Sequence, residues 1–349
     1  MESYLKNGNG QYDLTMGIID LIRGAKRYIK AANFLFQDAR VISALQEAAK
    51  HGVAVFIISN IRLEEYKEDS DYPVQVSNTT LPNLNMLREI GCHVHILTEL
   101  HAKFVIADGQ SGIIMSANFA SNSISKNTET GVLVYNKELD DLEYVFEKLY
   151  LSSDITDIDR NDHRNIFSKK TRLVQLDTNN HFKSNARFTI ASNKEGNNLR
   201  NCHVYSLLNE IIDIIVNAQK YLYIVTWHFK YLDQLPAIME ALKSAIKRGV
   251  KVTAYCNLYG QGSSSFNASR AEVKKLERIG CKVYGDDNNH SKCVLSETRG
   301  VVFSANIDGS TGLFTGFEVG CVLTNDQLTA ATQHVRTLIT NSNKNKTWK

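Results

Sequence analysis

The alternation of apolar and polar residues predicts a series of helices and strands in the first part of the chain. Apolar positions recur with helical spacing over residues 14–26, and a mostly apolar segment follows at residues 27–34. A second helical pattern, residues 41–49, precedes Gly52, a residue type typical of the position just after a helix. Residues 53–59 are again apolar and strand-sized. This part of the chain is therefore expected to run helix, strand, helix, strand.

The second half of the chain shows the same order of patterns. A helical pattern at residues 203–218 precedes an apolar strand at 220–227, and a further helical pattern at 238–246 precedes Gly249 and a strand at 250–256. Strands that alternate with helices are typical of α/β proteins. We therefore expect an α/β fold with a largely parallel sheet in each half.

Five blocks of the first half recur in the same order in the second half, which indicates a tandem duplication. The matched blocks are Ile19–Ile29 with Ile212–Leu222, Ala44–Val53 with Ala241–Val250, Leu87–Cys92 with Leu276–Cys281, Ser116–Asn118 with Ser304–Asn306, and Glu129–Gly131 with Glu318–Gly320. From the Leu87 block onward the offset stays at 188 or 189 residues. The expected organisation is a first lobe (1–150), a basic inter-lobe connection (151–185), a second lobe (186–340) and a polar tail (341–349).

Composition and charge narrow the class of protein. Hydrophobic residues make up 43% and charged residues 22% of the chain, the balance of a soluble globular protein. The apolar segments are shorter than the roughly 20 residues of a membrane helix, and the first residues lack the order of a signal peptide. The six cysteines are scattered, as is typical of reduced thiols. We therefore expect a cytoplasmic protein without membrane insertion.

The charge is unevenly distributed along the chain. Residues 1–150 carry a net charge of −5, residues 151–200 carry +3 and residues 201–349 carry +5. A basic second half mildly favours a polyanionic partner, although ordinary solvated surface explains the same bias.

One constellation of chemically active residues occurs in both copies. His101 and Lys103 are followed by Asp108 in the first copy, and the same spacing recurs in the second copy. In each copy a Ser-Ala-Asn segment follows, and then a glutamate 28 residues after the histidine. The second set consists of His290, Lys292, Glu297, Asn306 and Glu318, and the first set is completed by Asn118 and Glu129. A lone histidine or lysine is usually satisfied locally, but a duplicated constellation in register favours catalysis.

This paired pattern resembles the phospholipase D superfamily, which includes phospholipases, nucleases and tyrosyl-DNA phosphodiesterases. The resemblance covers residues 10–150 and 186–340. It implies two similar lobes packed about a pseudo-two-fold axis, with the active site at their junction. The sequence departs from the family pattern in having Glu297 instead of aspartate. It also has Met115 and Phe303 where a glycine usually precedes Ser-x-Asn.

The resemblance implies a role for each residue of the constellation. His101 would form a phosphohistidine as the nucleophile and His290 would be the general acid, although the two-fold arrangement leaves the reverse order open. Two lysines and two asparagines would bind the phosphoryl group, and the two glutamates would orient the histidines. Asp108 and Glu297 are expected to be structural. A zinc site is disfavoured because a lysine lies two residues from each histidine, so no metal or cofactor is expected.

Weaker patterns lie near the predicted site. Residues 227–229 (Trp-His-Phe) and 34–36 (Phe-Leu-Phe) follow the first strand of each lobe, where side chains face a ligand crevice or the core. Core packing is the favoured interpretation for both segments. The segment 260–265 (Gly-Gln-Gly-Ser-Ser-Ser) lacks the spacing of a nucleotide-binding motif and is expected to be a loop near the site.

These observations favour a metal-independent phosphodiesterase that acts on nucleic acid, DNA or RNA. A phospholipase or phosphatidyl transferase is the alternative, and the expected amphipathic membrane-binding segment is not evident. A non-catalytic nucleic-acid-binding module on the same fold is a third hypothesis, disfavoured because both motifs keep their histidine and lysine. A role in defence against foreign DNA, with a helicase or similar protein partner, is a further hypothesis.

Overall fold

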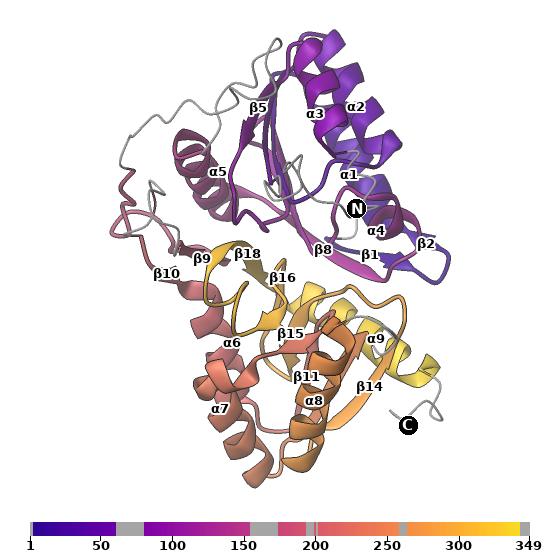
Figure 1. Ribbon diagram of the computed structural model, residues 1–349, viewed down its shortest axis with the longest axis vertical. Coiled ribbons are helices and arrows are strands. Elements are labelled where there is room, and N and C mark those ends of the chain that lie inside the picture. Colours follow the sequence, from indigo (N-terminus) through magenta and orange to yellow (C-terminus); the bar gives the residue numbers. More distant parts are fainter. Residues whose placement is uncertain are drawn as a thin grey trace, which may run out of the picture.

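The computed structural model describes residues 3–60, 80–153, 174–192, 199, 202–257 and 264–342. Two lobes of similar architecture follow one another along the chain, and each is built on an eight-stranded sheet (Figure 1). Parts of the expected connection (154–173), of the polar tail (343–349) and of the glycine-rich loop (260–263) lie outside the described residues.

The elements of lobe 1 are β1 (Tyr4–Gly8), β2 (Gln11–Tyr12), α1 (Asp13–Gly24), β3 (Tyr28–Asn33), α2 (Ala39–Lys50), β4 (Ala54–Ser59), α3 (Thr80–Glu89), β5 (His93–Ile96), β6 (Phe104–Ala107), β7 (Ser111–Met115), α4 (Ser121–Ser125), β8 (Glu129–Val134) and α5 (Asn136–Leu151). The elements of lobe 2 are β9 (Ala186–Ala191), β10 (Val204–Tyr205), α6 (Ser206–Asn217), β11 (Tyr221–Val225), β12 (Phe229–Lys230), the 3-10 helix η2 (Leu232–Gln234), α7 (Pro236–Lys247), β13 (Lys251–Asn257), α8 (Ser264–Arg278), β14 (Lys282–Asp286), β15 (Cys293–Ser296), β16 (Gly300–Phe303), β17 (Ile307–Asp308), β18 (Gly316–Val322) and α9 (Asn325–Asn341).

The two sheets have the same strand order. The order is β2-β1-β8-β7-β6-β3-β4-β5 in lobe 1 and β10-β9-β18-β16-β15-β11-β13-β14 in lobe 2, so every strand of one sheet has a counterpart in the other. The expectation of two similar α/β lobes is therefore confirmed.

The expectation of a largely parallel sheet is wrong. In each sheet only the last three strands pair in parallel, as β3-β4-β5 and β11-β13-β14, and the other pairs are antiparallel. For β6 and β7 the reason is the short connection, because a parallel pair needs a long crossover. Only three residues join β6 to β7, and Asp108 and Gly109 turn the chain there with φ of 58° and 67°.

Helices α1 and α2 of lobe 1, and α6 and α7 of lobe 2, cover the outer face of each sheet and bury the apolar stripes that the sequence pattern indicates. On α1, Leu14, Ile18 and Ile22 are completely buried. Burial of one such side chain contributes about 1.5–3 kcal/mol. The Asp38 side chain begins α2 by accepting a hydrogen bond from the Arg40 backbone N–H, and Gly52 follows its end with φ of 83°.

The two lobes share a third apolar core that lies between them. Side chains from both sheets and from α5 and α9 form one contiguous cluster, which includes Phe146 of α5, Phe188 of β9 and Val335 of α9. Polar contacts join the same elements, because the Tyr4 hydroxyl lies 2.9 Å from His334 Nδ1. A core shared in this way fixes one lobe relative to the other.

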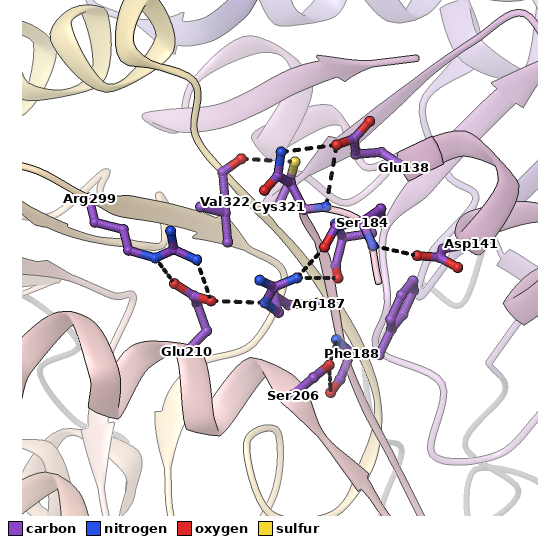
Figure 2. A network of polar contacts seen from close by, with 12 residues as sticks. Glu138, Asp141, Ser184, Arg187, Phe188, Ser206, Glu210, Arg299, Cys321 and Val322 are labelled. Atoms are coloured by element: carbon purple, nitrogen blue, oxygen red, sulfur yellow. Dashed lines mark hydrogen bonds and ion pairs between the residues drawn. The ribbon is translucent and has the colours of Figure 1, made fainter. Parts of the chain in front are cut away.

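A polar network holds the chain where it enters lobe 2 (Figure 2). Asp141 of α5 accepts hydrogen bonds from the backbone N–H groups of Phe182 (2.9 Å) and Ser184 (3.2 Å). Just beyond, the Glu210 carboxylate of α6 binds Arg187 at 2.9 Å and Arg299 at 2.5 Å. Burial opposes ionisation of Glu210, but the two arginines outweigh it and lower its pKa. The network thus ties α5 of lobe 1 to the first strand and first helix of lobe 2.

In the part of the chain that the structure describes, no helix is both long enough and apolar enough to cross a lipid bilayer.

Candidate active site

Two backbone contacts between the lobes position the histidines of the paired motifs. The His101 N–H donates to the Phe317 carbonyl at 3.0 Å, and the His290 N–H donates to the Thr128 carbonyl at 2.9 Å. Phe317 and Thr128 come directly before the two motif glutamates. Each histidine is therefore placed beside the glutamate of the opposite lobe.

The side chains follow this crossed arrangement. His101 Nδ1 hydrogen-bonds Glu318 Oε1 at 2.6 Å, and His290 Nδ1 lies 2.7 Å from Glu129 Oε1. Both glutamates are almost fully buried. The sequence predicted that the two glutamates would orient the histidines, and in the structure each glutamate contacts the histidine of the opposite lobe.

Each glutamate is held by a serine of its own lobe. The second carboxylate oxygen of Glu129 accepts a hydrogen bond from Ser116, and that of Glu318 accepts one from Ser304, both at 2.5 Å. These serines open the Ser-Ala-Asn segments. The sequence analysis noted the serines but predicted no role for them. Their recurrence in both copies was the feature of the sequence that could have indicated one.

The motif lysines are completely buried beside the histidines. Lys103 Nζ donates to the His101 carbonyl and Lys292 Nζ to the His290 carbonyl, each at 2.7 Å. Burial lowers the pKa of Lys103 to about 7 and that of Lys292 to about 8, against the opposing effect of the glutamates. Both ammonium groups therefore lose their protons far more readily than a solvated lysine does.

The histidines are held in the neutral form. Burial lowers the pKa of His290 to about 4, and it also lowers that of His101, although a glutamate beside each ring favours the charged form. Burial likewise opposes ionisation of Glu129 and Glu318, but the contacts of each carboxylate with its paired histidine, a buried lysine and a serine hydroxyl outweigh burial and lower the pKa. A neutral imidazole whose Nδ1–H donates a hydrogen bond to a carboxylate has its lone pair on Nε2.

A cavity of about 520 Å³ opens onto this constellation. His101, His290, Asn118, Asn306 and Glu318 all line it. Among the described residues, the side-chain oxygens of Asn118 and Asn306 are buried without a hydrogen-bond partner. The two oxygens can therefore accept a hydrogen bond from a ligand, whereas phosphoryl oxygens would be bound by the N–H groups of the same amides. Two imidazoles and two amides line one cavity, and two ammonium groups are buried beside the histidines. Together these groups can hold and attack a phosphoryl group.

Comparison with known proteins agrees with this chemistry. A family model described as "Cardiolipin synthase, PLD-like domain" matches the chain twice, at residues 18–150 and 211–339. Together the two matches cover well over half of the chain, one in each lobe. The chain belongs to the phospholipase D superfamily. The resemblance drawn from the paired motifs is thus confirmed.

Solved structures share the fold of this phospholipase D superfamily member. Phosphatidylserine synthase from Haemophilus influenzae Rd KW20 matches with a TM-score of 0.65 and 14% identity, over 97% of this chain and 86% of that chain. Polyphosphate kinase from Porphyromonas gingivalis matches with a TM-score of 0.55 and 14% identity, over 96% of this chain but only 49% of its own length. Identities this low show the fold alone.

A third structure is Nuc from Salmonella typhimurium, a phospholipase D family member. It has 19% identity over 43% of this chain and 95% of its own, with a TM-score of 0.37. The search of curated proteins gave no match.

The acids of the two phospholipase D motifs lie away from the cavity. Asp108 accepts hydrogen bonds from the backbone N–H groups of Lys26, Arg27 and Tyr28 at 2.7, 2.7 and 2.9 Å, where β3 begins. Glu297 takes the equivalent place before β11 and accepts from residues 219–221 at 2.8, 3.3 and 3.4 Å. Their contacts are thus with backbone at the entry to the central strand of each sheet.

The two glycine positions of the phospholipase D pattern carry core residues here. Met115 and Phe303 are completely buried, each in the outer apolar core of its own lobe. Both side chains therefore pack beneath the sheet, and the serine and asparagine that follow keep their places at the site.

The segments after the first strand of each lobe divide between core and cavity. Phe36 and Phe229 are buried in the cores, as the core-packing interpretation expected. Phe34, Trp227 and His228 instead line the cavity, with the Phe34 ring 5.3 Å from that of His101 and the Trp227 ring 5.5 Å from that of His290. For these three side chains that interpretation was wrong.

One pair of cavity residues was missed from the sequence. His228 Nε2 lies 3.4 Å from Asp308 Oδ2, and both side chains are largely buried. Lobe 1 has Leu35 and Ala120 at the corresponding positions, so the pair breaks the two-fold symmetry of the site. Two polar residues at positions that are apolar in the first copy were the feature of the sequence that could have indicated this pair.

Proposed function

We propose that the protein is a metal-independent phosphodiesterase that cleaves nucleic acid through a phosphohistidine on His101. The observation that carries the proposal is the crossed pair of histidines, each held at Nδ1 by a buried glutamate, on either side of one cavity. His101 is assigned as the nucleophile because its side chain is 28% exposed, against 12% for His290.

The reaction has two steps. Nε2 of His101 attacks phosphorus, the bond from phosphorus to the leaving oxygen breaks, and His290 gives that oxygen a proton. A water molecule then gives a proton back to His290 and attacks phosphorus, which breaks the phosphorus–nitrogen bond and frees His101. Asn118, Asn306 and the two lysines stabilise the charge on the non-bridging oxygens.

The charge balance of the site suits a monoanionic substrate. With both histidines neutral, two carboxylates and two ammonium groups cancel. A bound phosphodiester adds one negative charge and raises the pKa values of the lysines and of His290. Substrate binding therefore favours protonation of His290, which donates this proton in the first step.

The asymmetry of the cavity indicates where the leaving group lies. Attacking and leaving atoms lie on opposite sides of phosphorus in an in-line displacement. With His101 attacking, the leaving group is on the side of His290, where Trp227 and His228 form the wall. Trp227 is 40% exposed, and an exposed indole can stack on a base.

A specific finding favours phosphatidyl transfer as a second candidate. The matching family model is described as "Cardiolipin synthase, PLD-like domain", and a phosphatidylserine synthase shares the fold over nearly the whole chain. The same chemistry serves this reaction if an alcohol takes the place of water in the second step.

The test measures cleavage of end-labelled single- and double-stranded DNA and RNA in excess EDTA, with phosphatidylglycerol vesicles assayed in parallel. We expect nucleic-acid cleavage that falls about 10²–10⁴-fold in His101→Asn. The matched control is His51→Asn, because His51 is an exposed histidine at the end of α2. Lipid turnover without nucleic-acid cleavage would overturn the nuclease proposal in favour of the second candidate.

A further inference from the structure

Lobe 2 carries a large hollow away from the active site, on the face of its sheet that α9 partly covers. The hollow has a volume of about 1080 Å³. Its floor comes from β11, β13 and β14, and Arg336 of α9 lies at its side. We call it the lobe 2 groove and define it by six lining residues: Tyr221, Tyr223, Lys251, Lys282, Tyr284 and Arg336.

The residues of the groove follow from the register of the strands. Tyr221 pairs with Lys251, and Thr253 pairs both with Tyr223 and with Lys282. Side chains at alternate positions of paired strands point to one face. The tyrosines and lysines therefore form one continuous surface.

The groove is basic, and its cations are not neutralised within it. Lys220, Lys251, Lys282 and Arg336 line it and no aspartate or glutamate does. Within the described residues, none of these four cations forms an ion pair. Arg336 is instead held by tyrosines, since its guanidinium lies 5.2 Å from the Tyr221 ring and its Nε donates to the Tyr223 hydroxyl at 3.3 Å.

Lobe 1 shows that the fold does not require such a groove. There Lys30, at the position of Tyr223, binds Glu147 at 3.0 Å, and Glu147 occupies the helix position of Arg336. Aromatic stacking closes the rest of that face, with His95 on Tyr150 at 3.5 Å. In lobe 1 the equivalent surface is therefore filled by aromatic side chains and neutralised by an ion pair, whereas in lobe 2 it is open and positively charged.

We infer that the lobe 2 groove is a second binding site, which holds single-stranded nucleic acid outside the active site. Lysine and arginine neutralise phosphates, and tyrosine rings stack on bases without regard to sequence. The role of the groove in catalysis rests on the proposed nuclease function, because it would retain a strand whose scissile phosphate lies at His101.

The test compares Lys251→Glu/Lys282→Glu, and separately Arg336→Glu, with the wild type and with Lys247→Glu/Lys274→Glu. Lys247 and Lys274 are exposed lysines of lobe 2 outside the groove, so the control makes the same change of charge as the double groove variant and a larger one than Arg336→Glu. Arg336→Glu places at this position the residue type that lobe 1 has there, Glu147. The binding of a fluorescein-labelled 20-nucleotide single strand is measured by anisotropy over a range of salt concentrations.

We expect both groove variants to bind the labelled strand at least tenfold more weakly than the control does. The double variant should also reduce the slope of log affinity against log salt by about 1.4, which is about 0.7 for each of two phosphates that the lysines no longer neutralise. Hydrolysis of bis(p-nitrophenyl) phosphate, which is too small to reach the groove, should stay unchanged, and this confirms that the variants are folded.

Equal binding by groove variants and control would overturn the inference. So would a loss of binding to vesicles of acidic phospholipid with no loss of binding to the oligonucleotide, since the groove would then serve a membrane surface. The proposed function fails separately, if the wild type cleaves no nucleic acid. Binding that depends on Lys251 and Lys282 would still support the groove in that case.

Discussion

At the scale of single residues, the crossed pairs decide how substitutions combine. Glu318 serves His101 and Glu129 serves His290, although each glutamate belongs to the other lobe. We expect Glu318→Gln to lower kcat/KM by about 10²–10⁴-fold, and to add little when His101 is already asparagine. A double-mutant cycle with bis(p-nitrophenyl) phosphate measures this coupling.

A second double-mutant cycle tests the other crossed pair. Glu129→Gln combined with His290→Asn should show the same strong coupling, because these two residues also act as a unit. The within-lobe combinations are Glu129→Gln with His101→Asn and Glu318→Gln with His290→Asn. If they showed the same coupling energy as the cross-lobe combinations, the assignment of partners would be contradicted.

The buried lysines predict a pH dependence of substrate capture. Lys103 and Lys292, with pKa values of about 7 and about 8, bind phosphate in their protonated form. As pH rises through this range the free enzyme loses positive charge, so kcat/KM for a diester that stays monoanionic should fall. A pH profile from 5 to 10 measures the fall, and a profile that stays flat up to pH 9 would contradict the role of these lysines.

Part of this residue-level chemistry could be predicted from the sequence. The spacing from His101 to Glu129, repeated from His290 to Glu318, was enough to identify the set of residues. It could not reveal the crossing, because that depends on contacts between lobes that are far apart in the sequence. The pairing of His228 with Asp308 was not predicted for the opposite reason, since it has no counterpart in the first copy.

At the scale of elements, the motif acids stabilise the entry to the central strands. Asp108 accepts three short backbone hydrogen bonds and is 7% exposed. We expect Asp108→Asn to lower the free energy of unfolding by about 1–3 kcal/mol in urea denaturation, with kcat unchanged. Glu297→Gln should cost less, because two of the three hydrogen bonds of Glu297 are longer.

The same substitution has a defined pH signature. Burial opposes ionisation of Asp108, but its three backbone donors outweigh it and lower the pKa. The stabilisation is therefore fully present above the unfolded pKa of about 3.9 and is lost as pH falls through the lower folded value. The difference between wild type and Asp108→Asn should vanish in strong acid, and a constant difference would refute the account.

Element boundaries were more predictable than the way the strands pair. The sequence pattern placed the first helices and strands within a few residues of α1, β3, α2 and β4, because the helices bury one apolar face each and the strands are short, largely buried apolar segments. Strand direction depends instead on the length and backbone of the connections. Where helices and strands alternate, β3, β4 and β5 are parallel, as expected. The turn at Asp108 and Gly109 joins β6 to β7 without a helix and makes that pair antiparallel.

At the scale of the whole molecule, both lobes of one chain complete one site. The shared core and the network around Glu210 hold the lobes together within the chain. We therefore expect a mixture of His101→Asn and His290→Asn proteins to remain as inactive as either alone. Activity assays of the equimolar mixture measure this, and recovery toward a quarter or more of wild-type activity would show that lobes exchange between chains.

The crossed pairs also bear on the history of the molecule. In a symmetric dimer, residue i of one copy meets residue j of the other, and j meets i in return. His101 with Glu318 and Glu129 with His290 have this relation inside a single chain. A fusion of two identical subunits would inherit it complete. After such a fusion the copies could diverge on their outer faces, as in the lobe 2 groove, while selection kept both glutamates, since the loss of either disables the histidine of its twin.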